Sequence, residues 1–296
     1  MQDVMKGNNL KKKYKGFQLD IPKLHIPKGF ATALIGENGA GKTTLINMLT
    51  GIRMDYKGEL FYFDEQEQDV DKVKERIGYT GPGNYFLPHW NVKQVEEISS
   101  LLFETFDEEK FWDICVELGV TTARHVKGKK VNDLSDGNKV KLMLAAVLAR
   151  KTDCLILDEP ASPLDPLMRD KLCEIIREYL TEGNGEKSVL FSTHNISDME
   201  NVTDYAIIVE HGNVVEEGFV EDLKEKYVMV KGEAKDAKAA EKILYSFSGN
   251  SYGFEGICLA ADLDKLAGMD IRVEVPTLFQ ISVAVMKANS TLKLHQ

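Results

Sequence analysis

The sequence predicts an α/β fold with a largely parallel sheet, because three short apolar segments alternate with helical patterns. The segments are 31–35, 153–157 and 188–192, and each has the length and composition of a buried strand. Strands that alternate with helices form parallel sheets, and such sheets bind ligands beyond the carboxyl ends of their strands. The residues that follow each segment are therefore the first candidates for a functional site.

Residues 36–43 follow the first segment and read Gly-Glu-Asn-Gly-Ala-Gly-Lys-Thr. They fit the phosphate-binding loop G-x-x-x-x-G-K-[ST], and a helical pattern continues over 44–49. Glycines let backbone N–H groups close around a phosphate, Lys42 supplies charge for the β- and γ-oxygens, and the Thr43 hydroxyl suits Mg²⁺. Chance produces such a match in about one chain in a hundred, and the flanking strand and helix weaken that alternative. The expected nucleotide contacts are Asn38, Gly39, Ala40, Gly41, Lys42, Thr43 and Thr44.

The other two segments also end in polar residues. The second ends at Asp158 and Glu159; we expect Asp158 to support Mg²⁺, and Glu159 to orient and deprotonate the attacking water. The third ends at His194. A lone acidic pair is usually surface charge and a lone histidine is usually structural, but here both follow core strands in a chain that has a phosphate loop. The expected catalytic residues are Lys42, Glu159 and His194, and the expected metal ligands are Thr43 and Asp158.

Alternating polarity over 4–26 predicts a strand pair ahead of the phosphate loop. Tyr14 stands about the right distance upstream to stack on an adenine base, and the alternative is an aromatic residue that packs on the sheet. The other expected elements are a strand at 59–64, a short strand at 77–79, a break at 81–84, a helical block at 91–118, a helix at 140–150 and a hairpin made from 207–209 and 214–217.

Composition limits the function classes. The chain has 296 residues, of which 43% are hydrophobic, so it can bury a large core. A net charge of -10 argues against sequence-independent nucleic-acid binding, so no nucleic-acid partner is expected. Four scattered cysteines indicate reduced core thiols. Residues 1–14 lack the apolar run of a signal peptide, and the longest apolar run, 142–149, is too short to span a bilayer. Work at a membrane would therefore need a separate spanning subunit.

These motifs together resemble the ATP-binding subunit of ABC transporters over roughly residues 4–227. Besides the phosphate loop, the chain has Leu-Ser-Asp-Gly at 134–137 as the family's signature, Leu-Asp-Glu-Pro at 157–160 as Walker B, Ser-Pro-Leu-Asp at 162–165 as the D-loop, and Ser-Thr-His at 192–194 as the switch histidine, in the family's order. The resemblance implies a P-loop NTPase core (1–81 and 141–227), an ABC-type helical subdomain with the signature (82–140) and a small α+β C-terminal extension (228–296).

The resemblance also implies how the residues work. ATP is hydrolysed with Mg²⁺, Tyr14 stacks on the adenine and His194 contacts the γ-phosphate. A second ATP-binding subunit, either the same chain or a different one, faces the first, so that Ser135 and Gly137 of one chain cap the γ-phosphate held by Lys42 of the other. An integral membrane subunit is the other expected partner, which places the chain at the inner face of the cell membrane. The expected role is to power export, with small peptides or drug-like molecules as candidate cargo.

Two departures from the family pattern stand out. Asp136 occupies a place where the family usually has glycine, and we expect it to cap its helix and face outward. The glutamine expected shortly after 77–79 is absent, and Gly81, Pro82 and Gly83 stand there. No residue inherits its role from the sequence. The alternatives are therefore a slow regulatory ATPase, or a non-transport relative that acts on a soluble partner.

The C-terminal stretch shows a strand at 228–230, a helix at 234–244, two more short strands and an apolar helix after Pro276. This last piece resembles the tail of exporter-type ATP-binding subunits, and the alternative is a generic α+β appendage. We expect a regulatory or dimer-supporting role for this stretch.

Overall fold

Three β-sheets organise the part of the chain that the computed structural model describes, residues 2–63, 70–83 and 85–289. The central sheet has the strand order β5-β6-β7-β3-β8-β9. Its first five strands are parallel and β9 is antiparallel to β8, which confirms the predicted largely parallel sheet. Its strands are β3 (Ala31–Ile35), β5 (Ile77–Thr80), β6 (Cys154–Leu157), β7 (Ser188–Thr193), β8 (Tyr205–Glu210) and β9 (Asn213–Phe219).

Alternate residues of this sheet face two different apolar clusters, as the period of two in a strand requires. In β3, Ala33 and Ile35 belong to one cluster with residues of α5 (Asp136–Leu148) and α6 (Pro166–Glu182), whereas Leu34 belongs to the other. The second cluster contains four residues of α1 (Lys42–Leu49). The central sheet is therefore covered on both faces, and its carboxyl edge is left for the polar residues.

A three-stranded antiparallel sheet completes the second cluster, in the order β2-β1-β4. It confirms the strand pair predicted ahead of the phosphate loop. The strand expected at 59–64 begins two residues earlier, and Asp64 lies outside the described residues. These elements are β1 (Asp3–Tyr14), β2 (Phe17–Pro27) and β4 (Lys57–Tyr62), and α2 (Val70–Arg76) leads from them to β5.

The helical block expected at 91–118 consists of two helices, α3 (Val92–Leu102) and α4 (Glu108–Glu117). Asn91 begins α3 with a capping box, since its side chain and that of Gln94 each accept the other's backbone N–H. Phe103 ends α3 in an extended conformation, and the Asp107 side chain caps α4. The break between α3 and α4 is thus set by local features such as the Asp107 cap, although apolar residues recur at helical spacing on both sides of it. Short 3₁₀ turns occur at Val131–Asp133, Ile196–Asp198, Glu200–Val202, Ala234–Asp236 and Ala260–Leu266.

The C-terminal part forms a four-stranded antiparallel sheet in the order β11-β12-β10-β13, reached through α7 (Val220–Lys226). The predicted helix at 234–244 is wrong in extent: only α8 (Ala237–Ala240) is regular, and it lacks a side-chain cap. Hydrogen-bonded turns continue to Leu244. Three strands follow in place of the expected two. The strands are β10 (Tyr227–Glu233), β11 (Tyr245–Gly249), β12 (Gly253–Leu259) and β13 (Ile271–Glu274).

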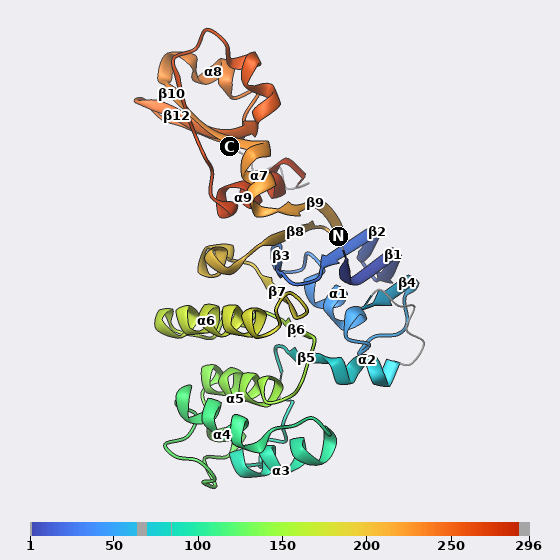
Figure 1. Cartoon of the computed structure of the whole chain (residues 1–296). Coiled ribbons are helices and arrows are strands. Elements are labelled where there is room, and N and C mark those ends of the chain that lie inside the picture. The colour runs from blue at the N-terminus through green and yellow to red at the C-terminus, as the bar shows by residue number, and fades with distance from the viewer. Residues whose placement is uncertain (1, 64–69, 84, 290–296) are drawn as a thin grey trace.

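The predicted apolar helix after Pro276 is confirmed as α9 (Leu278–Asn289), and it packs back against β8 and α7. The C-terminal strands and α8 lie at one end of the molecule, and α3 and α4 lie at the other (Figure 1). All four cysteines are buried and free, as expected. Among the described residues, no helix has the length and apolar character needed to cross a membrane.

Candidate active site

The phosphate loop lies between β3 and α1. Gly39 and Gly41 have φ values of 89° and 112°, a left-handed conformation that glycine adopts without strain. A Cβ at Gly41 would also come within 2.9 Å of the Phe17 ring and the Leu19 side chain. Asn38, Gly39 and Thr43 are exposed, whereas Ala40 and Lys42 are buried. No side chain caps the N–H groups at the start of α1, and the adjoining loop is exposed at Asn38 and Gly39. This arrangement suits a phosphate.

The Lys42 side chain contacts both its own loop and the end of β6. Its Nζ donates a hydrogen bond to the Gly36 carbonyl at 2.7 Å and lies 3.1 Å from Glu159 Oε1. The lysine is 6% exposed and Glu159 is 20% exposed. A buried ammonium needs a charge partner, and a phosphate oxygen is a chemical substitute for this carboxylate.

Asp158 is held through both carboxylate oxygens. The Thr43 hydroxyl donates to Oδ2 at 2.9 Å, and the Ser192 hydroxyl donates to Oδ1 at 2.5 Å. Ser192 Oγ also accepts the backbone N–H of Glu159 at 2.9 Å. The structure therefore brings together the two expected metal ligands, hard oxygen donors of the kind that Mg²⁺ prefers. Sequence reasoning did not give Ser192 a role, although it lies in the same Ser-Thr-His run as His194.

Glu159 connects the lysine to the histidine. Its Oε2 lies 2.7 Å from Nδ1 of His194, while its Oε1 faces Lys42. Glu159 has a φ of 52°, one of the few positive values at a residue other than glycine. Such a conformation costs on the order of 1–3 kcal/mol and persists where surrounding contacts fix it. All three expected catalytic residues therefore meet at one point, around the carboxylate of Glu159, which can accept a proton and is positioned by a strained backbone.

The turn between β8 and β9 is also hydrogen-bonded to the phosphate loop. The N–H of Gly212 donates to the Ala40 carbonyl at 2.9 Å, and the Gly212 carbonyl accepts the N–H of Asp20 at 2.8 Å. With a φ of 80°, a Cβ on Gly212 would lie 2.0 Å from the Gln18 carbonyl oxygen. This glycine joins the phosphate loop to the β1–β2 hairpin. The sequence showed it only as part of a hairpin turn.

Tyr14 ends β1 on that same hairpin, where it pairs with Phe17. The Tyr14 ring is half-buried, and the cationic groups of Lys12 and Arg53 each lie 5.5 Å from its centroid. Because Phe17 approaches Gly41, the hairpin places aromatic surface beside the phosphate loop. Adenine stacking by Tyr14 stays a prediction.

The signature residues begin α5. Ser135 is the N-cap and accepts the N–H of Asn138, whereas Asp136 is the first helical residue. The expected cap at Asp136 is therefore wrong, because the preceding serine already satisfies the free N–H. Asp136 is 85% exposed and pairs with Lys139 at 3.0 Å, but it also lines the cavity that contains Asp158 and Glu159, so it does not face away from the site as expected. Gly137 lies close to the D-loop, since a Cβ there would be 3.0 Å from the Pro163 carbonyl oxygen.

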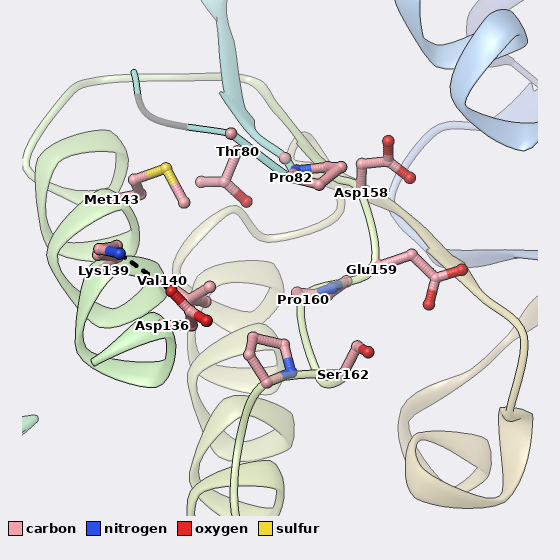
Figure 2. A pocket seen from close by; sticks show the side chains of 13 residues that line it. Thr80, Pro82, Asp136, Lys139, Val140, Met143, Asp158, Glu159, Pro160 and Ser162 are labelled. Atoms are coloured by element: carbon pink, nitrogen blue, oxygen red, sulfur yellow. Dashed lines mark hydrogen bonds and ion pairs between the residues drawn. The ribbon is translucent and has the colours of Figure 1, made fainter. Parts of the chain in front are cut away.

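A cavity of about 440 Å³ separates this helix start from the end of β6. Figure 2 shows Glu159 extending away from Asp136 and Lys139, which stand on α5 across the cavity. Ser135 and Gly137 are thus placed apart from the Lys42 group in one chain. The cavity is lined by Thr80, Gly81, Pro82, Gly83, Asp136, Lys139, Val140, Met143, Asp158, Glu159, Pro160, Ser162 and Pro163.

Comparisons with known proteins agree with this geometry. A family model described as "ABC transporter" matches residues 19–162. The tungstate uptake system ATP-binding protein TupC of Peptoclostridium acidaminophilum is 31% identical over 72% of this chain and 97% of its own length. The chain belongs to the ABC transporter family. It is an ATP-binding subunit of that family, and it binds ATP with Mg²⁺ and hydrolyses it.

Other ABC transporter proteins are similar over comparable shares of the chain. The ATP-binding protein YxlF of Bacillus subtilis, itself uncharacterised, is 32% identical over 68% of this chain and 66% of its own length. The lantibiotic transport ATP-binding protein SrtF of Streptococcus pyogenes is 29% identical over 72% of this chain and 89% of its own length. A solved ATP-binding subunit of an ABC transporter has a TM-score of 0.64 at 21% identity, covering 75% of this chain and 92% of its own, and confirms the predicted P-loop NTPase fold.

Proposed function

We propose that this chain is the ATPase motor of a transporter that exports peptide or drug-like cargo through a separate integral membrane subunit. The observation that carries the motor assignment is the contact of Glu159 with both Lys42 and His194, at 3.1 Å and 2.7 Å. A carboxylate held between two cationic or proton-donating groups, beside a phosphate loop, fits a base whose partners are shared with the γ-phosphate of ATP.

The residues divide the work as follows. Lys42 and the N–H groups of the loop position the phosphates. Glu159, released from Lys42 when phosphate oxygens take its place, accepts a proton from the attacking water. His194 orients Glu159 and donates toward the γ-phosphate. When Mg²⁺ is bound, held by Thr43 and Asp158 with the phosphates, it neutralises charge on the leaving group. The protein supplies positioning and charge, with no covalent intermediate.

A second ATP-binding chain completes the site in this proposal. Ser135 and Gly137 flank Asp136, which lies across the cavity from Glu159, at the start of a helix whose free N–H groups favour an anion. In a facing copy or a related chain, they would cap the γ-phosphate at Lys42. The proposal divides the chain into an ATPase core (1–81 and 141–227), a helical subdomain (82–140) and an accessory domain (228–296), and ATP would hold the two chains together.

The direction of transport is the finer part of the proposal. Export is the direction implied by the resemblance of the stretch after Pro276, which forms α9, to the tail of exporter-type subunits. The similarity to the lantibiotic transport protein supports the choice of cargo and leaves the direction open. Import is the second candidate, because the tungstate uptake protein is 31% identical over 97% of its length. Cargo contacts belong to the membrane subunit in either case. The chain itself would lie at the inner face of the cell membrane.

Affinity purification of this chain from gently solubilised native cells, followed by mass spectrometry, tests the partner. A polytopic membrane protein in stoichiometric amount is expected. Recovery with ribosomes or other soluble machines instead would contradict the transporter role and favour the alternative of a non-transport or regulatory ATPase.

Direction is tested separately, with the membrane subunit so identified. Inside-out vesicles that contain both subunits are given ATP and a labelled amphipathic peptide. Export predicts accumulation of the peptide in the lumen with the parent chain and none with Glu159→Gln. Uptake of tungstate by right-side-out vesicles, with no peptide movement, would establish import.

A further inference from the structure

Two tyrosine hydroxyls meet just beyond the end of β5. Tyr79 lies in β5 and Tyr85 lies six residues later, and the Tyr85 hydroxyl donates to the Tyr79 oxygen at 3.0 Å. Their rings are almost perpendicular, at 86°, with centroids 5.5 Å apart. The contact therefore fixes both the rings and the hydroxyls, across the break formed by Gly81, Pro82 and Gly83.

The hydroxyl pair rests directly against the backbone of Gly81. A Cβ at this position would lie 2.4 Å from Tyr79 Oη and 2.9 Å from Tyr85 Oη. The φ of Gly81 is outside the left-handed region, so its backbone conformation is open to other residues. Glycine is needed here for space, because any side chain would separate the hydroxyls from the backbone.

This backbone segment contacts the predicted metal ligand. The carbonyl of Thr80, next to Gly81, accepts the N–H of Asp158 at 2.8 Å. Thr80, Gly81 and Asp158 all line the 440 Å³ cavity, and Figure 2 shows Thr80 and Asp158 at the same side of it. Gly81 is therefore connected to Asp158 through one residue and one hydrogen bond.

The other side of the pair lines an apolar groove of about 250 Å³. Tyr79, Tyr85 and Trp90 line this groove, and Met143 lines both the groove and the cavity. Burial raises the pKa of both phenols, and the charge of Asp158 adds to the effect, so both hydroxyls keep their protons at neutral pH. The hydrogen-bonded pair thus lies between the groove and Gly81, which lines the cavity.

We propose that Tyr79 and Tyr85 are positioning residues for ATP hydrolysis. Their hydroxyl pair fixes the Thr80–Gly81 backbone that holds Asp158, and it links the position of Asp158 to that of the side chains that line the groove. The proposal rests on the role of Asp158 given above. It places the pair at the segment where the sequence lacks the family's glutamine.

The test removes only the hydroxyls. Tyr79→Phe and Tyr85→Phe keep the rings that line the groove, and Tyr252→Phe, on a residue that is 92% exposed in the C-terminal part, is the matched control. Steady-state hydrolysis by the full chain is measured against ATP and against free Mg²⁺. We expect kcat to fall about fivefold in each pair variant, the factor that one hydrogen bond contributes. The free Mg²⁺ needed for half-maximal rate should rise by a similar factor, while KM for ATP stays within about twofold.

A second readout follows the groove without turnover. The chain has two tryptophans, Trp90 in the groove and the buried Trp112, so 5-fluorotryptophan labelling gives two ¹⁹F resonances that are assigned by substitution. In a Glu159→Gln background, adding Mg·ATP should shift the Trp90 resonance. The shift should be at least halved by Tyr79→Phe or Tyr85→Phe and unchanged by Tyr252→Phe.

Two outcomes overturn the proposal in different ways. Parental kcat, Mg²⁺ dependence and Trp90 shift in both pair variants would show that the hydroxyls position nothing, and would leave the site assignment intact. An unchanged Mg²⁺ dependence in Asp158→Asn would instead contradict the metal role of Asp158, and the positioning role would fall with it.

Discussion

The carboxyl edge of the central sheet and the C-terminal sheet use polar residues in opposite ways. At the edge, Asp158, Glu159 and Lys42 are largely buried, and each is held by a residue from a different strand or loop. In the C-terminal sheet, the ion pair of Lys231 and Glu274 joins neighbouring strands at the surface, at 2.7 Å. The buried side chains of that sheet's own cluster are apolar.

The two arrangements suit different roles: buried polar groups at the carboxyl edge suit catalysis, whereas the C-terminal sheet has an apolar core and polar groups at its surface. Buried polar groups fixed by cross-strand partners are arranged before substrate arrives, at the expense of local strain such as the φ of Glu159. Solvated surface pairs contribute little to stability. We therefore expect substitutions at the carboxyl edge to change turnover more than stability. Matched substitutions in the C-terminal sheet should change neither turnover nor stability strongly.

The largest contrast is expected for lysine. Lys42→Ala removes the charge for the phosphates and leaves Glu159 without one of its two partners, so kcat/KM should fall about 1000-fold. Lys231→Ala, the matched control in β10, should leave kcat/KM within about twofold. Steady-state hydrolysis measures both. Comparable losses in the two variants would erase the distinction between the regions.

Serine gives a smaller contrast. Ser192→Ala removes the hydrogen bonds to Asp158 and to the Glu159 N–H, and kcat should fall about tenfold because two positioning contacts are lost. Ser248→Ala, on an exposed residue of β11, should have no effect. The nucleotide affinity of Ser192→Ala is measured alongside, by equilibrium dialysis. A loss of affinity with unchanged kcat would contradict a positioning role.

Glycine tests packing around the loop. Gly212→Ala puts a Cβ 2.0 Å from the Gln18 carbonyl oxygen at a φ of 80°, so the free energy of unfolding should fall by about 3 kcal/mol. Gly268→Ala has a similar φ of 90° with open space around it, so only the conformational cost of about 1 kcal/mol applies. Urea unfolding compares the two. Equal losses would mean that the close approach at Gly212 carries no energy.

The smallest effect concerns pH. Burial raises the pKa of Glu210, and the nearby Glu37 adds to this, while His211 opposes it. The ionised carboxylate therefore destabilises the fold. This destabilisation is zero at pH values below the pKa of the unfolded state and reaches its full size at pH values above the pKa of the folded state. Glu210→Gln should stabilise the chain at pH 7 by about 0.5 kcal/mol once screening is counted, and should be neutral at pH 4.

Glu274 in the C-terminal sheet supplies the opposite sign. Its hydrogen bond with Lys231 lowers the pKa, so its contribution to stability is present above the unfolded pKa and is lost as pH falls through the folded one. Glu274→Gln should destabilise the chain slightly at pH 7 and not at low pH. Thermal unfolding from pH 7 down to about pH 3 compares both variants, and the same sign for the two at pH 7 would contradict these pKa directions.

Local patterns predicted most of the fold and indicated the main residues of the proposed site. Gly36 to Thr43, the Asp158–Glu159 pair and His194 are each marked by the apolar strand that precedes them, and the structure places all three motifs at neighbouring strand ends. Each signal lies within about ten residues, so no knowledge of the fold is needed to find it.

What the sequence missed depends on which strands become neighbours. Ser192 reaches Asp158 because β6 and β7 are adjacent, and Gly212 reaches Ala40 because β8 lies beside β3. The Tyr79–Tyr85 contact depends on how the chain turns after β5. The helix expected over 234–244 was too long because spacing alone does not show that the segment lacks an N-cap and turns into β11.

The most direct test of the account is the rate of ATP hydrolysis by Glu159→Gln, with nucleotide binding measured on the same preparation. Glutamine keeps the shape of the side chain but accepts no proton at the carboxyl, so turnover should fall by at least about 100-fold while Mg·ATP still binds. Parental turnover in this variant would contradict the assignment of Glu159 as the base, and with it the proposed hydrolytic site at the end of β6.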